Sequence, residues 1–373
     1  FQDVTLTIEP GVIVRFDLDI GLELRGKLIA IGTSTDKITF TSNSSSPQMN
    51  DWNGIITNLT SDPFGEGDQV TMEHCIGEYA HHFINLITAH NGPYIFRNCY
   101  FNNNNKANNS DGYPSTIFED CTFESNYTAL DGGSKTRVSN SSFINNIYGV
   151  EGVGVVENCY FSGNTGIALA PYGSTTGCLI ENNNIGVRCY FNAVNDTFVD
   201  NTIIDNTFGV DILSYFNEAI DFTGNTICNN TDYNIRLLTG NNADLSYNCW
   251  CSSDETEIRS SINDGYINTN YGLVDFMPIS DNCPENNLGE NDSSINPIKM
   301  VVFPNPIKTT FDVVIKSNVG FEIELYNLDG KKIFQQKFIK QINIDMQKYS
   351  SGFYFYQIRG AEGILKKGKL LKT

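Results

Sequence analysis

"ENCYFSGN", residues 157–164, decides the fold, because close variants of it recur along the chain. The variants read RNCYFNNNN at 97–105, EDCTFESN at 119–126 and SNSSFINN at 139–146. In each variant the second residue is Asn or Asp. A small residue, a polar residue and Phe follow it, and another Asn comes after the Phe. Self-similarity at a period of about 20–50 residues is typical of solenoids and related repeat proteins.

The Asn or Asp that opens each unit gives the period of the repeat. The steps between successive opening positions are 22, 20, 18, 24, 18, 24 and 23 residues, with a mean of about 21. The opening positions are Asn98, Asp120, Asn140, Asn158, Asn182, Asp200, Gly224 and Tyr247.

The apolar residues inside a unit indicate strands. Cys99 and Phe101 alternate with polar residues, as do Cys159 and Phe161, which is the period of a strand with one buried face. A second short strand follows the Asn, for example YGVEGV at 148–153. Short strands, tight turns and this period predict an all-β solenoid: a right-handed parallel β-helix with about 4.8 Å between coils.

Stacking of the coils would place equivalent residues above one another. The Asn that ends each unit is expected to form a structural ladder, with side-chain amides bonded along the stack as in cross-β structures. The ladder residues are Asn126, Asn146, Asn164, Asn206 and Asn230. Cys99 and Cys121 would also stack, and their spacing leaves two alternatives open, a disulfide or a column of buried thiols.

Both ends of this region differ from its middle. Residues 6–42 and 51–55 resemble the first coils of bacterial right-handed β-helix proteins, and residues 247–279 resemble their last coil. We therefore place a β-helix passenger at 1–283, with its C-terminal capping coil at 247–283.

The capping coil contains one predicted helix. Ser253 or Asp254 can cap its N-terminus, and Glu255 and Glu257 lie at the positive end of its dipole. This helix is expected to cover the open end of the solenoid, whose last strands would otherwise expose unpaired edges.

After the capping coil the sequence changes character. Residues 284–299 are rich in Pro, Gly, Asn and Ser and are typical of a linker. From residue 300 the chain alternates as some seven short strands, and Asp329-Gly330 is a hairpin signal. A segment of this size and pattern predicts a small immunoglobulin-like β-sandwich.

Four stretches of the C-terminal segment carry a family resemblance. They are FPNP at 303–306, LYNLDGKKI at 325–333, SGFYFYQI at 351–358 and KKGKLLKT at 366–373. In this order and at the C-terminus, they make residues 300–373 resemble the type A C-terminal sorting domain of type IX secretion substrates. The residues that match its pattern are Pro304, Asn305, Pro306, Tyr326, Gly330, Lys331, Gly352, Tyr354, Lys369 and Lys372.

The resemblance implies a route of export. Such proteins enter the periplasm of a Gram-negative bacterium with a cleaved leader, fold there and cross the outer membrane through the type IX translocon. The implied partners of residues 300–373 are this translocon and its outer-membrane shuttle protein, and the implied location is the cell surface or the medium. A surface protease usually removes the domain, and we expect that cut within 284–300. A leader, with chain of unknown length, is expected before Phe1, which adjoins a strand pattern.

The composition of the passenger limits its partners. Residues 301–373 carry twelve Lys and Arg against six Asp and Glu, so the rest of the chain has a net charge of −25 within the total of −19. No nucleic acid is expected as a partner, because phosphates require Lys and Arg. The ten cysteines include no CxxC, so neither zinc nor another cofactor is expected, and calcium is left open. An even number of cysteines permits disulfides, and Cys283 is expected to pair with Cys249 or Cys251.

Several residues are candidates for chemistry on polysaccharides. Lyases of this fold use Lys or Arg as a base, and hydrolases use carboxylates that face one cleft. The nearest lyase-like group is Asp131, Lys135 and Arg137, which we interpret as a solvated turn. The other candidate bases are Arg97, Lys106, Arg188 and Arg236, and the candidate acids are Asp196, Asp200, Asp205, Asp211 and Asp221. For the histidines His74, His81, His82 and His90 the alternatives are a metal site at His81-His82 or a surface loop, and we interpret them as a surface loop. The tyrosines Tyr94, Tyr100, Tyr113, Tyr160, Tyr172 and Tyr190 recur near coil corners, where they would either stack on sugars or pack the coils.

The leading interpretation is an exported, non-enzymatic surface protein, an adhesin or glycan-binding passenger of type IX secretion. Its recurring tyrosines would stack on the faces of sugar rings. The alternative is a polysaccharide lyase or glycoside hydrolase of the β-helix fold, and a third interpretation is a structural component of the cell surface. The sequence assigns no catalytic residue and names no ligand.

Overall fold

A computed structural model describes most of the chain, which divides into two compact units, Phe1–Asn286 and Asn287–Thr373. The described residues are 4–57, 69–86, 93–110, 115–191, 197–215, 221–280, 300–303, 307, 309–315, 319–327, 331–350, 352–360 and 363–372.

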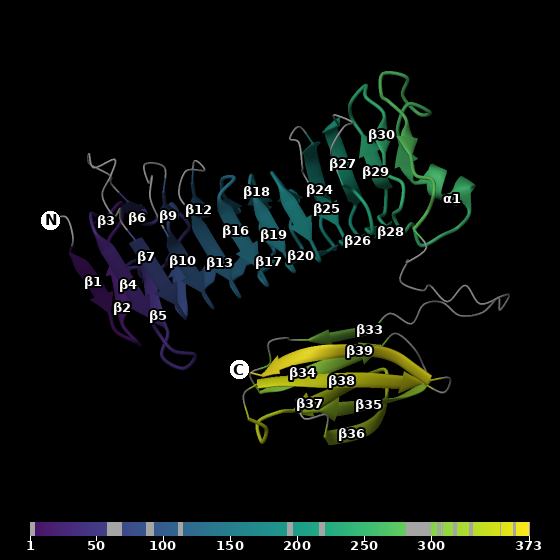
Figure 1. Ribbon diagram of the computed structural model, residues 1–373. Helices are drawn as coiled ribbons and strands as arrows, with labels where there is room; N and C mark the ends of the chain where they lie inside the picture. The colour runs from purple at the N-terminus through teal and green to yellow at the C-terminus, as the bar shows by residue number, and fades with distance from the viewer. Residues whose placement is uncertain are drawn as a thin grey trace. The chain divides into compact units, whose positions relative to one another are not determined.

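The first unit is built from three parallel sheets, and most coils of the chain contribute one strand to each sheet (Figure 1). The first sheet contains β1 (Thr5–Ile8), β4 (Lys27–Ile31), β7 (Gln69–Glu73), β10 (Tyr94–Arg97), β13 (Thr116–Glu119), β16 (Thr136–Ser139), β19 (Val155–Glu157), β22 (Ser174–Thr176) and β25 (Phe198–Val199). The second sheet contains β2 (Ile13–Phe16), β5 (Ile38–Ser42), β8 (Cys75–Glu78), β11 (Tyr100–Asn102), β14 (Thr122–Glu124), β17 (Ser142–Ile144), β20 (Tyr160–Ser162), β23 (Leu179–Glu181), β26 (Thr202–Ile204) and β28 (Thr226–Cys228). The third sheet contains β3 (Gly21–Leu24), β6 (Gly54–Thr57), β9 (His82–Asn85), β12 (Lys106–Asn109), β15 (Thr128–Asp131), β18 (Tyr148–Glu151), β21 (Ile167–Ala170), β24 (Ile185–Phe191), β27 (Phe208–Tyr215), β29 (Tyr233–Leu237) and β31 (Ile262–Asn263).

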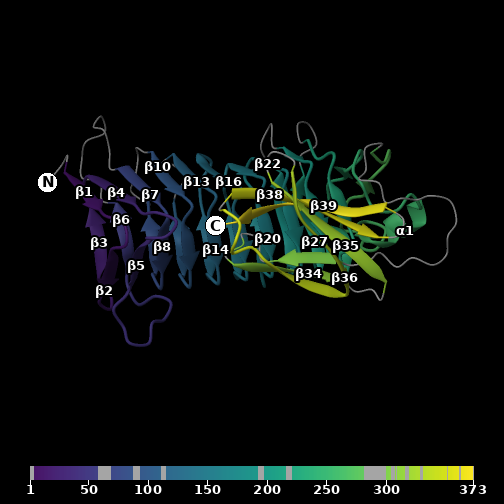
Figure 2. The same cartoon turned by 90° about the horizontal axis from the view of Figure 1, so that it is seen from below.

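The strand register confirms the predicted parallel β-helix. Arg137 pairs with Val155, 18 residues later, and Tyr94 pairs with Thr116, 22 residues later. An early coil is longer, since Phe40 pairs with Gly77. The spacing over the whole solenoid is therefore about 23 residues, slightly longer than the predicted 21. Figure 2 shows the strands following one another along the solenoid in chain order.

Two left-handed turn positions in most coils explain the repeated motif. In ENCYFSGN, Asn158 and Gly163 have φ of 52° and 71°, a region that Gly, Asn and Asp adopt at low cost. The turn from the first to the second sheet uses His74, Asn98, Asp120, Asn140, Asn158, Gly177, Asp200, Gly224 and Tyr247. The turn from the second to the third sheet uses Tyr79, Asn103, Ser125, Asn145, Gly163, Asn182, Asp205 and Asn229.

One position in the predicted alignment is wrong. Asn182 lies in the second turn of its coil, and Gly177 takes the place in the first turn that the alignment gave to Asn182. The alignment missed Gly177 because it followed Asn and Asp. Glycine adopts the same left-handed conformation at low cost, so Gly177 forms the turn without matching the motif.

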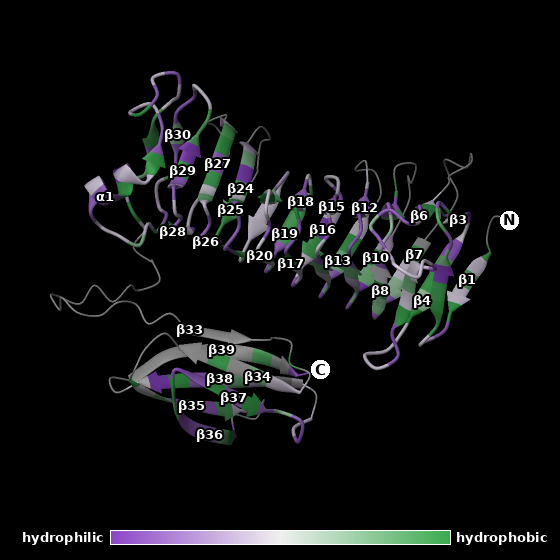
Figure 3. Cartoon of the chain, turned by 180° about the vertical axis from the view of Figure 1, so that it is seen from behind, coloured by the Kyte–Doolittle hydropathy of each residue, from purple (hydrophilic) through white to green (hydrophobic). Residues whose placement is uncertain are grey.

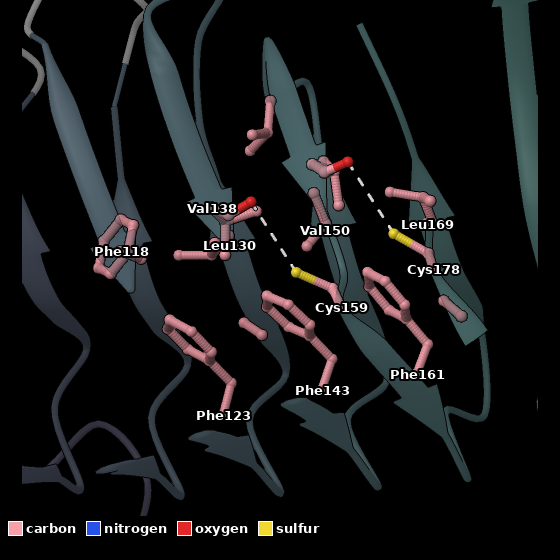
Figure 4. Packing of buried hydrophobic residues seen from close by; sticks show 14 of the residues in the cluster. Phe118, Phe123, Leu130, Val138, Phe143, Val150, Cys159, Phe161, Leu169 and Cys178 are labelled. Atoms are coloured by element: carbon pink, nitrogen blue, oxygen red, sulfur yellow. Dashed lines mark hydrogen bonds between the residues drawn. The ribbon is translucent and has the colours of Figure 1, made fainter. Parts of the chain in front are cut away.

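The interior of the solenoid is a stack of apolar side chains. Phe101, Phe123, Phe143 and Phe161 lie on consecutive strands of the second sheet, and their ring centroids are 5.0, 4.8 and 4.8 Å apart. Aromatic rings in offset stacks at this distance contribute beyond the area they bury. Figure 4 shows three of these rings, Phe123, Phe143 and Phe161, beside Leu130, Val150 and Leu169 of the third sheet.

The residue after the first turn points into the core and is often cysteine. Cys75, Cys99, Cys121, Cys159 and Cys178 are buried free thiols. The disulfide alternative for Cys99 and Cys121 is therefore wrong, and the column of buried thiols is formed. The thiols donate to backbone carbonyls, as from Cys159 Sγ to Val138 O at 3.9 Å (Figure 4).

The last coils form a cap. Helix α1 (Glu255–Ser260) begins at Asp254, whose side chain accepts hydrogen bonds from the backbone N–H groups of Thr256 and Glu257. Ile258 of α1 is buried, and β30 (Ala243–Asp244) pairs with β32 (Val274–Asp275) nearby in the chain.

The cysteines of the cap differ in part from the prediction. Cys251 bonds to Cys228, so the alternative in which Cys251 pairs with Cys283 is wrong. Cys228 and Cys251 lie on successive coils, and the solenoid therefore brings together two cysteines that are 23 residues apart. Cys249 is also disulfide-bonded. Cys283, which was predicted to pair with Cys249 or Cys251, lies outside the described residues.

The second unit is antiparallel. Its strands are β33 (Met300–Phe303), β34 (Thr310–Ile315), β35 (Gly320–Tyr326), β36 (Lys332–Ile339), β37 (Gln341–Asp345), β38 (Gly352–Gly360) and β39 (Gly363–Lys372). The strands β36 and β37 share only the pair Ile339–Gln341, so the sheet folds over at that corner. Buried Phe311 and Ile344 from one half meet Ile323 and Ile358 from the other in one core, as in the predicted small β-sandwich.

Two predicted features of this part lie outside the described residues. One is the linker at 284–299. The other is the hairpin turn at Asp329-Gly330, of which residues 328–330 are not described, although the flanking strands β35 and β36 do pair antiparallel.

Candidate functional site

The outer face of the third sheet carries a line of charged and polar residues. Each residue follows a buried core residue of its strand by one position, for example Asp131 after Leu130 and Glu151 after Val150, and therefore points outward. We call this line the charged column. Its residues, in the order set by strand pairing, are Asn109, Asp131, Glu151, Ala170, Arg188, Asp211, Arg236 and Asn263.

The first half of the charged column is mainly acidic. Lys106 forms an ion pair with Asp131 and donates from Nζ to Asn109 Oδ1 at 3.2 Å. Burial and the neighbouring Asp131 raise the pKa of Glu151. His82 is the strand partner of Lys106, and burial together with repulsion from His81 and Lys106 lowers the pKa of His82 to about 4. His82 is therefore neutral at pH 7.

The second half of the charged column is a buried carboxylate between two arginines. Asp211 is 0% exposed, whereas the side chains of Arg188 and Arg236 are 28% and 20% exposed. Arg236 binds Asp211 through two hydrogen bonds, Nε to Oδ1 at 2.6 Å and Nη2 to Oδ2 at 2.7 Å. Arg188 adds one longer bond from Nη2 to Oδ2 at 3.2 Å. The guanidinium of Arg236 also lies 3.5 Å above the ring centre of Phe208.

The strands that carry the arginines stand out by composition and length. In Figure 3, hydrophilic segments interrupt the hydrophobic colouring on β24 and β29. β24 and β27 have seven and eight residues, whereas β15 and β18 have four. The third sheet is thus widest where the arginines lie. This arrangement offers hydrogen-bond donors and acceptors along the axis of the solenoid.

The lyase-like group predicted from sequence is not assembled. Asp131 is on the third sheet and pairs with Lys106, whereas Arg137 is on the first sheet and pairs with Glu157 at 2.6 Å. Lys135 is exposed in the turn between these two sheets.

The predicted aspartates do not share one cleft. Asp200 and Asp205 occupy left-handed turns, and Asp221 accepts a hydrogen bond from Thr223 at 2.6 Å. Asp211 alone of the four described aspartates belongs to the charged column, and Asp196 lies outside the described residues.

The histidines are also dispersed in their roles. His74 occupies a left-handed turn, and His81 Nδ1 lies 2.8 Å from Asn50 Oδ1 with its ring against that of His82. His90 lies outside the described residues. Within the described ranges, no group of three or more His, Cys, Asp and Glu is placed to hold a metal ion.

The tyrosines differ in exposure. Tyr94 is buried in the core, and Tyr100 and Tyr160 bond to Glu124 and Glu181 on the second sheet. Tyr172 is 60% exposed and Tyr190 is 51% exposed, and they lie two residues beyond Ala170 and Arg188 of the charged column. Tyr113 lies outside the described residues. The predicted tyrosine array is therefore reduced to two exposed rings beside the column.

Five of the predicted sorting-signal residues are described with their contacts. The hydroxyl of Tyr326 donates to Glu324 at 2.9 Å, and that of Tyr354 donates to the carbonyl of Ser350 at 2.6 Å. The backbone N–H of Lys331 donates to Asn327 Oδ1 at 2.8 Å, Gly352 has φ of 144°, and Lys372 is buried. The residues Pro304, Asn305, Pro306 and Gly330 lie outside the described residues. Lys369 is described only by its backbone pairing with Phe355.

Sequence reasoning missed the charged column as a unit. It named Asp131, Arg188, Asp211 and Arg236 separately and did not name Glu151. A signal was present: Arg188 and Asp211 are 23 residues apart, and Asp211 and Arg236 are 25 apart, which are coil spacings.

Comparison with known proteins identifies the second unit. Residues 301–372, about a fifth of the chain, match the family described as "Secretion system C-terminal sorting domain". The second unit is a type IX sorting domain. The protein is therefore a secreted cargo with a β-helix fold, and its sorting domain is the part that the secretion system recognises.

The other comparisons add less. This chain is similar to a crystal structure of an alginate lyase from Paenibacillus sp. str. FPU-7, with 11% sequence identity and a TM-score of 0.21. The match covers 74% of this chain and 99% of the alginate lyase chain. A TM-score this low carries no argument about activity or substrate. No curated protein matches the sequence. In the described part of the chain, no helix is long and apolar enough to cross a membrane.

Proposed function

We propose that the β-helix is a glycan-binding passenger, and that the protein serves as an adhesin or glycan-binding protein outside the cell. The charged column with its two exposed rings, Tyr172 and Tyr190, is the observation that carries this proposal. Sugar sites combine flat aromatic faces with a few placed polar groups. A solenoid repeats such groups at about 4.8 Å, which suits an extended chain.

The ionic contacts of the column favour binding over catalysis. A lyase base must lose its proton, but a neighbouring carboxylate stabilises the protonated form of a basic side chain. Lys106 is paired with Asp131, and Arg188 and Arg236 are both paired with Asp211. Lys106, beside the column, and the column's two arginines, Arg188 and Arg236, therefore all act as hydrogen-bond donors to carboxylates.

The test exposes the full chain to plant, algal and host polysaccharides with calcium, and measures both retention on the polysaccharide and release of new chain ends. Retention without new chain ends is the expected result. New chain ends would instead support the alternative of a lyase or hydrolase, with Glu151 as the first residue to replace because its pKa is raised. Absence of both results from a folded chain would refute the proposal.

We also propose the finer steps of export. The sorting domain is recognised by the outer-membrane shuttle protein of the translocon after the chain has crossed the periplasm of a Gram-negative bacterium. A surface protease then cuts between residues 284 and 300, a range that includes the boundary between the two compact units at Asn286 and Asn287. Mass spectrometry of the protein recovered from the medium would give the new C-terminus. A C-terminus at residue 373 would contradict the cut.

A further inference from the structure

The two arginines of the charged column are not equivalent. Arg236 is fixed by two hydrogen bonds to Asp211 and by the ring of Phe208 beneath it. Arg188 has a single hydrogen bond of 3.2 Å to the same carboxylate. The Nε of Arg188 is buried and has no hydrogen-bond partner among the described residues. Arg188 is therefore the arginine with unused donors.

The group formed by Arg188, Arg236 and Asp211 has one positive charge in excess. Arg188 and Arg236 carry two positive charges against the single negative charge of Asp211, which is completely covered. A buried donor without an acceptor is costly, so it calls for an explanation such as a bound ion or ligand. A guanidinium presents its N–H groups in a planar fork that matches the oxygens of a carboxylate or a sulfate.

The surroundings of Arg188 suit a ligand on the outer face of the sheet. The pairing of β24 with β27 shifts register between Cys189 and Tyr190, one residue after Arg188. Such bulges redirect side chains and are frequent beside binding sites. Tyr190, just beyond the shift, has its ring 51% exposed. The exposed ring of Tyr190 therefore lies two residues from Arg188, whose Nε has no hydrogen-bond partner among the described residues.

The net charge of the passenger decides what kind of anion fits. Residues 1–300, which include the passenger, carry a net charge of −25 and repel dense polyanions at long range, so only a local contact can hold an anionic group. A single oxyanion on an otherwise neutral sugar can bind Arg188 and experiences little of this repulsion.

We propose that Arg188, oriented by Asp211 and backed by Arg236, binds one oxyanion substituent, a carboxylate or a sulfate, on a glycan. This inference rests on the proposed glycan binding and specifies its chemistry. Tyr190 would supply the neighbouring contact with the sugar ring. Arg236 is a positioning residue, because its Nε and Nη2 already donate to Asp211.

The experiment compares three sugars of one ring, glucose, glucuronate and glucose 6-sulfate, by ligand-detected NMR with the full chain. Binding of glucuronate, glucose 6-sulfate or both, with no detectable glucose binding at the same concentration, is expected. The two charged probes distinguish a carboxylate site from a sulfate site. Equal behaviour of all three sugars would overturn the inference.

Variants assign the binding to Arg188. Arg188→Gln should weaken binding of the preferred charged sugar by about 10- to 100-fold, since one charged hydrogen-bonding group is lost. Arg188→Lys keeps the charge without the fork and should weaken it less. Arg137→Gln is the matched control, because Arg137 forms one ion pair on the first sheet, and it should leave binding unchanged. Undiminished binding by folded Arg188→Gln would overturn the assignment.

The two proposals fail separately. If polysaccharides are retained while Arg188→Gln and the charged probes have no effect, the oxyanion site is wrong and glycan binding stands. If the charged monosaccharides bind at Arg188 but no polysaccharide is retained, glycan binding is wrong and the oxyanion site stands.

Discussion

The asparagine that ends each repeat is a structural residue with its polar groups satisfied inside the solenoid. The side-chain oxygen of Asn146 accepts from both the backbone and the side-chain nitrogen of Asn126, and its own amide donates to Phe123 and Asn164. The same bonds run through one buried column of side chains. Its members are Asn104, Asn126, Asn146, Asn164, Asn183, Asn206, Asn230 and Asn234.

Adjacent asparagines allow a sharp test of this column. Asn183→Ala removes the acceptor of the Asn164 backbone N–H and the donor to Phe161 O, so it should lower the free energy of unfolding by about 2–4 kcal/mol. Asn184→Ala is the control, because Asn184 is exposed. Thermal melts followed by circular dichroism should differ by roughly 5–10 °C. Equal melts for both variants would contradict the structural role.

Asn104, Asn183 and Asn234 of this column were not predicted, and the first two were missed for a local reason. Asn104 lies in the run NNNN at 102–105 and Asn183 in the run NNN at 182–184, so the sequence does not say which Asn points inward. Because the steps between units vary, the spacing does not identify the equivalent Asn in each coil either. Where one Asn stands alone after the strand, as Asn126 and Asn146 do, the residue could be named in advance.

At the scale of elements, the column of cysteines behaves as part of the core. Burial raises the pKa of the Cys121 and Cys159 thiols, which opposes formation of the reactive thiolate. All five thiols of this column are buried in the solenoid core. This explains how free cysteines persist in a secreted chain.

Thiol labelling tests this account. In the native protein a thiol reagent at pH 8 should react with none of the six cysteines that are free in the described residues. After unfolding without reductant, those six should react, while Cys228 and Cys251 stay bonded. Rapid labelling of the native chain, or disulfides linking Cys99 to Cys121, would contradict the arrangement.

The sorting domain contains an ionic network on β35, β36 and β38. Lys332 Nζ lies 2.8 Å from Glu324, and Arg359, Gln357 and Tyr326 also donate to this carboxylate. The hydrogen bond from Lys332 is the main cause that lowers the pKa of Glu324 from its ordinary 4.5 to about 2. The network therefore favours the ionised carboxylate in the folded domain.

The sign of this shift gives a pH dependence. Stability from Glu324 is complete above about pH 4.5 and is lost as the pH falls toward 2, because the unfolded chain takes up the proton first. Glu324→Gln should cost about 1 kcal/mol at pH 7, after allowance for solvent screening, and should flatten the pH profile of the sorting-domain melt. Glu322→Gln is the control on the same strand. An unchanged profile in Glu324→Gln would contradict the network.

The charged column shows where prediction from sequence ended. The types of residue were visible, since Arg188, Asp211 and Arg236 were each named. Their meeting depends on the strand register of the third sheet, which loops of unequal length set coil by coil. The Cys228–Cys251 bond was missed for the same reason, because it joins successive coils whose alignment requires the turns.

At the scale of the molecule, each compact unit has a hydrophobic core of its own. Calorimetry of the full chain should therefore give two transitions. The double variant Cys228→Ser with Cys251→Ser should lower the β-helix transition only, by about 3 kcal/mol for a loop of this length. One shared transition, or a shift in both, would contradict independent folding.

The central claim is that this secreted β-helix binds glycans through the outer face of its third sheet. The most direct measurement is retention of the full chain on the polysaccharide panel, compared with a variant that carries Tyr172→Ala and Tyr190→Ala. The account predicts retention of the native chain without new chain ends, and at least a tenfold loss in the variant while its melt is unchanged. Equal retention of both proteins, or no retention of either, would contradict it.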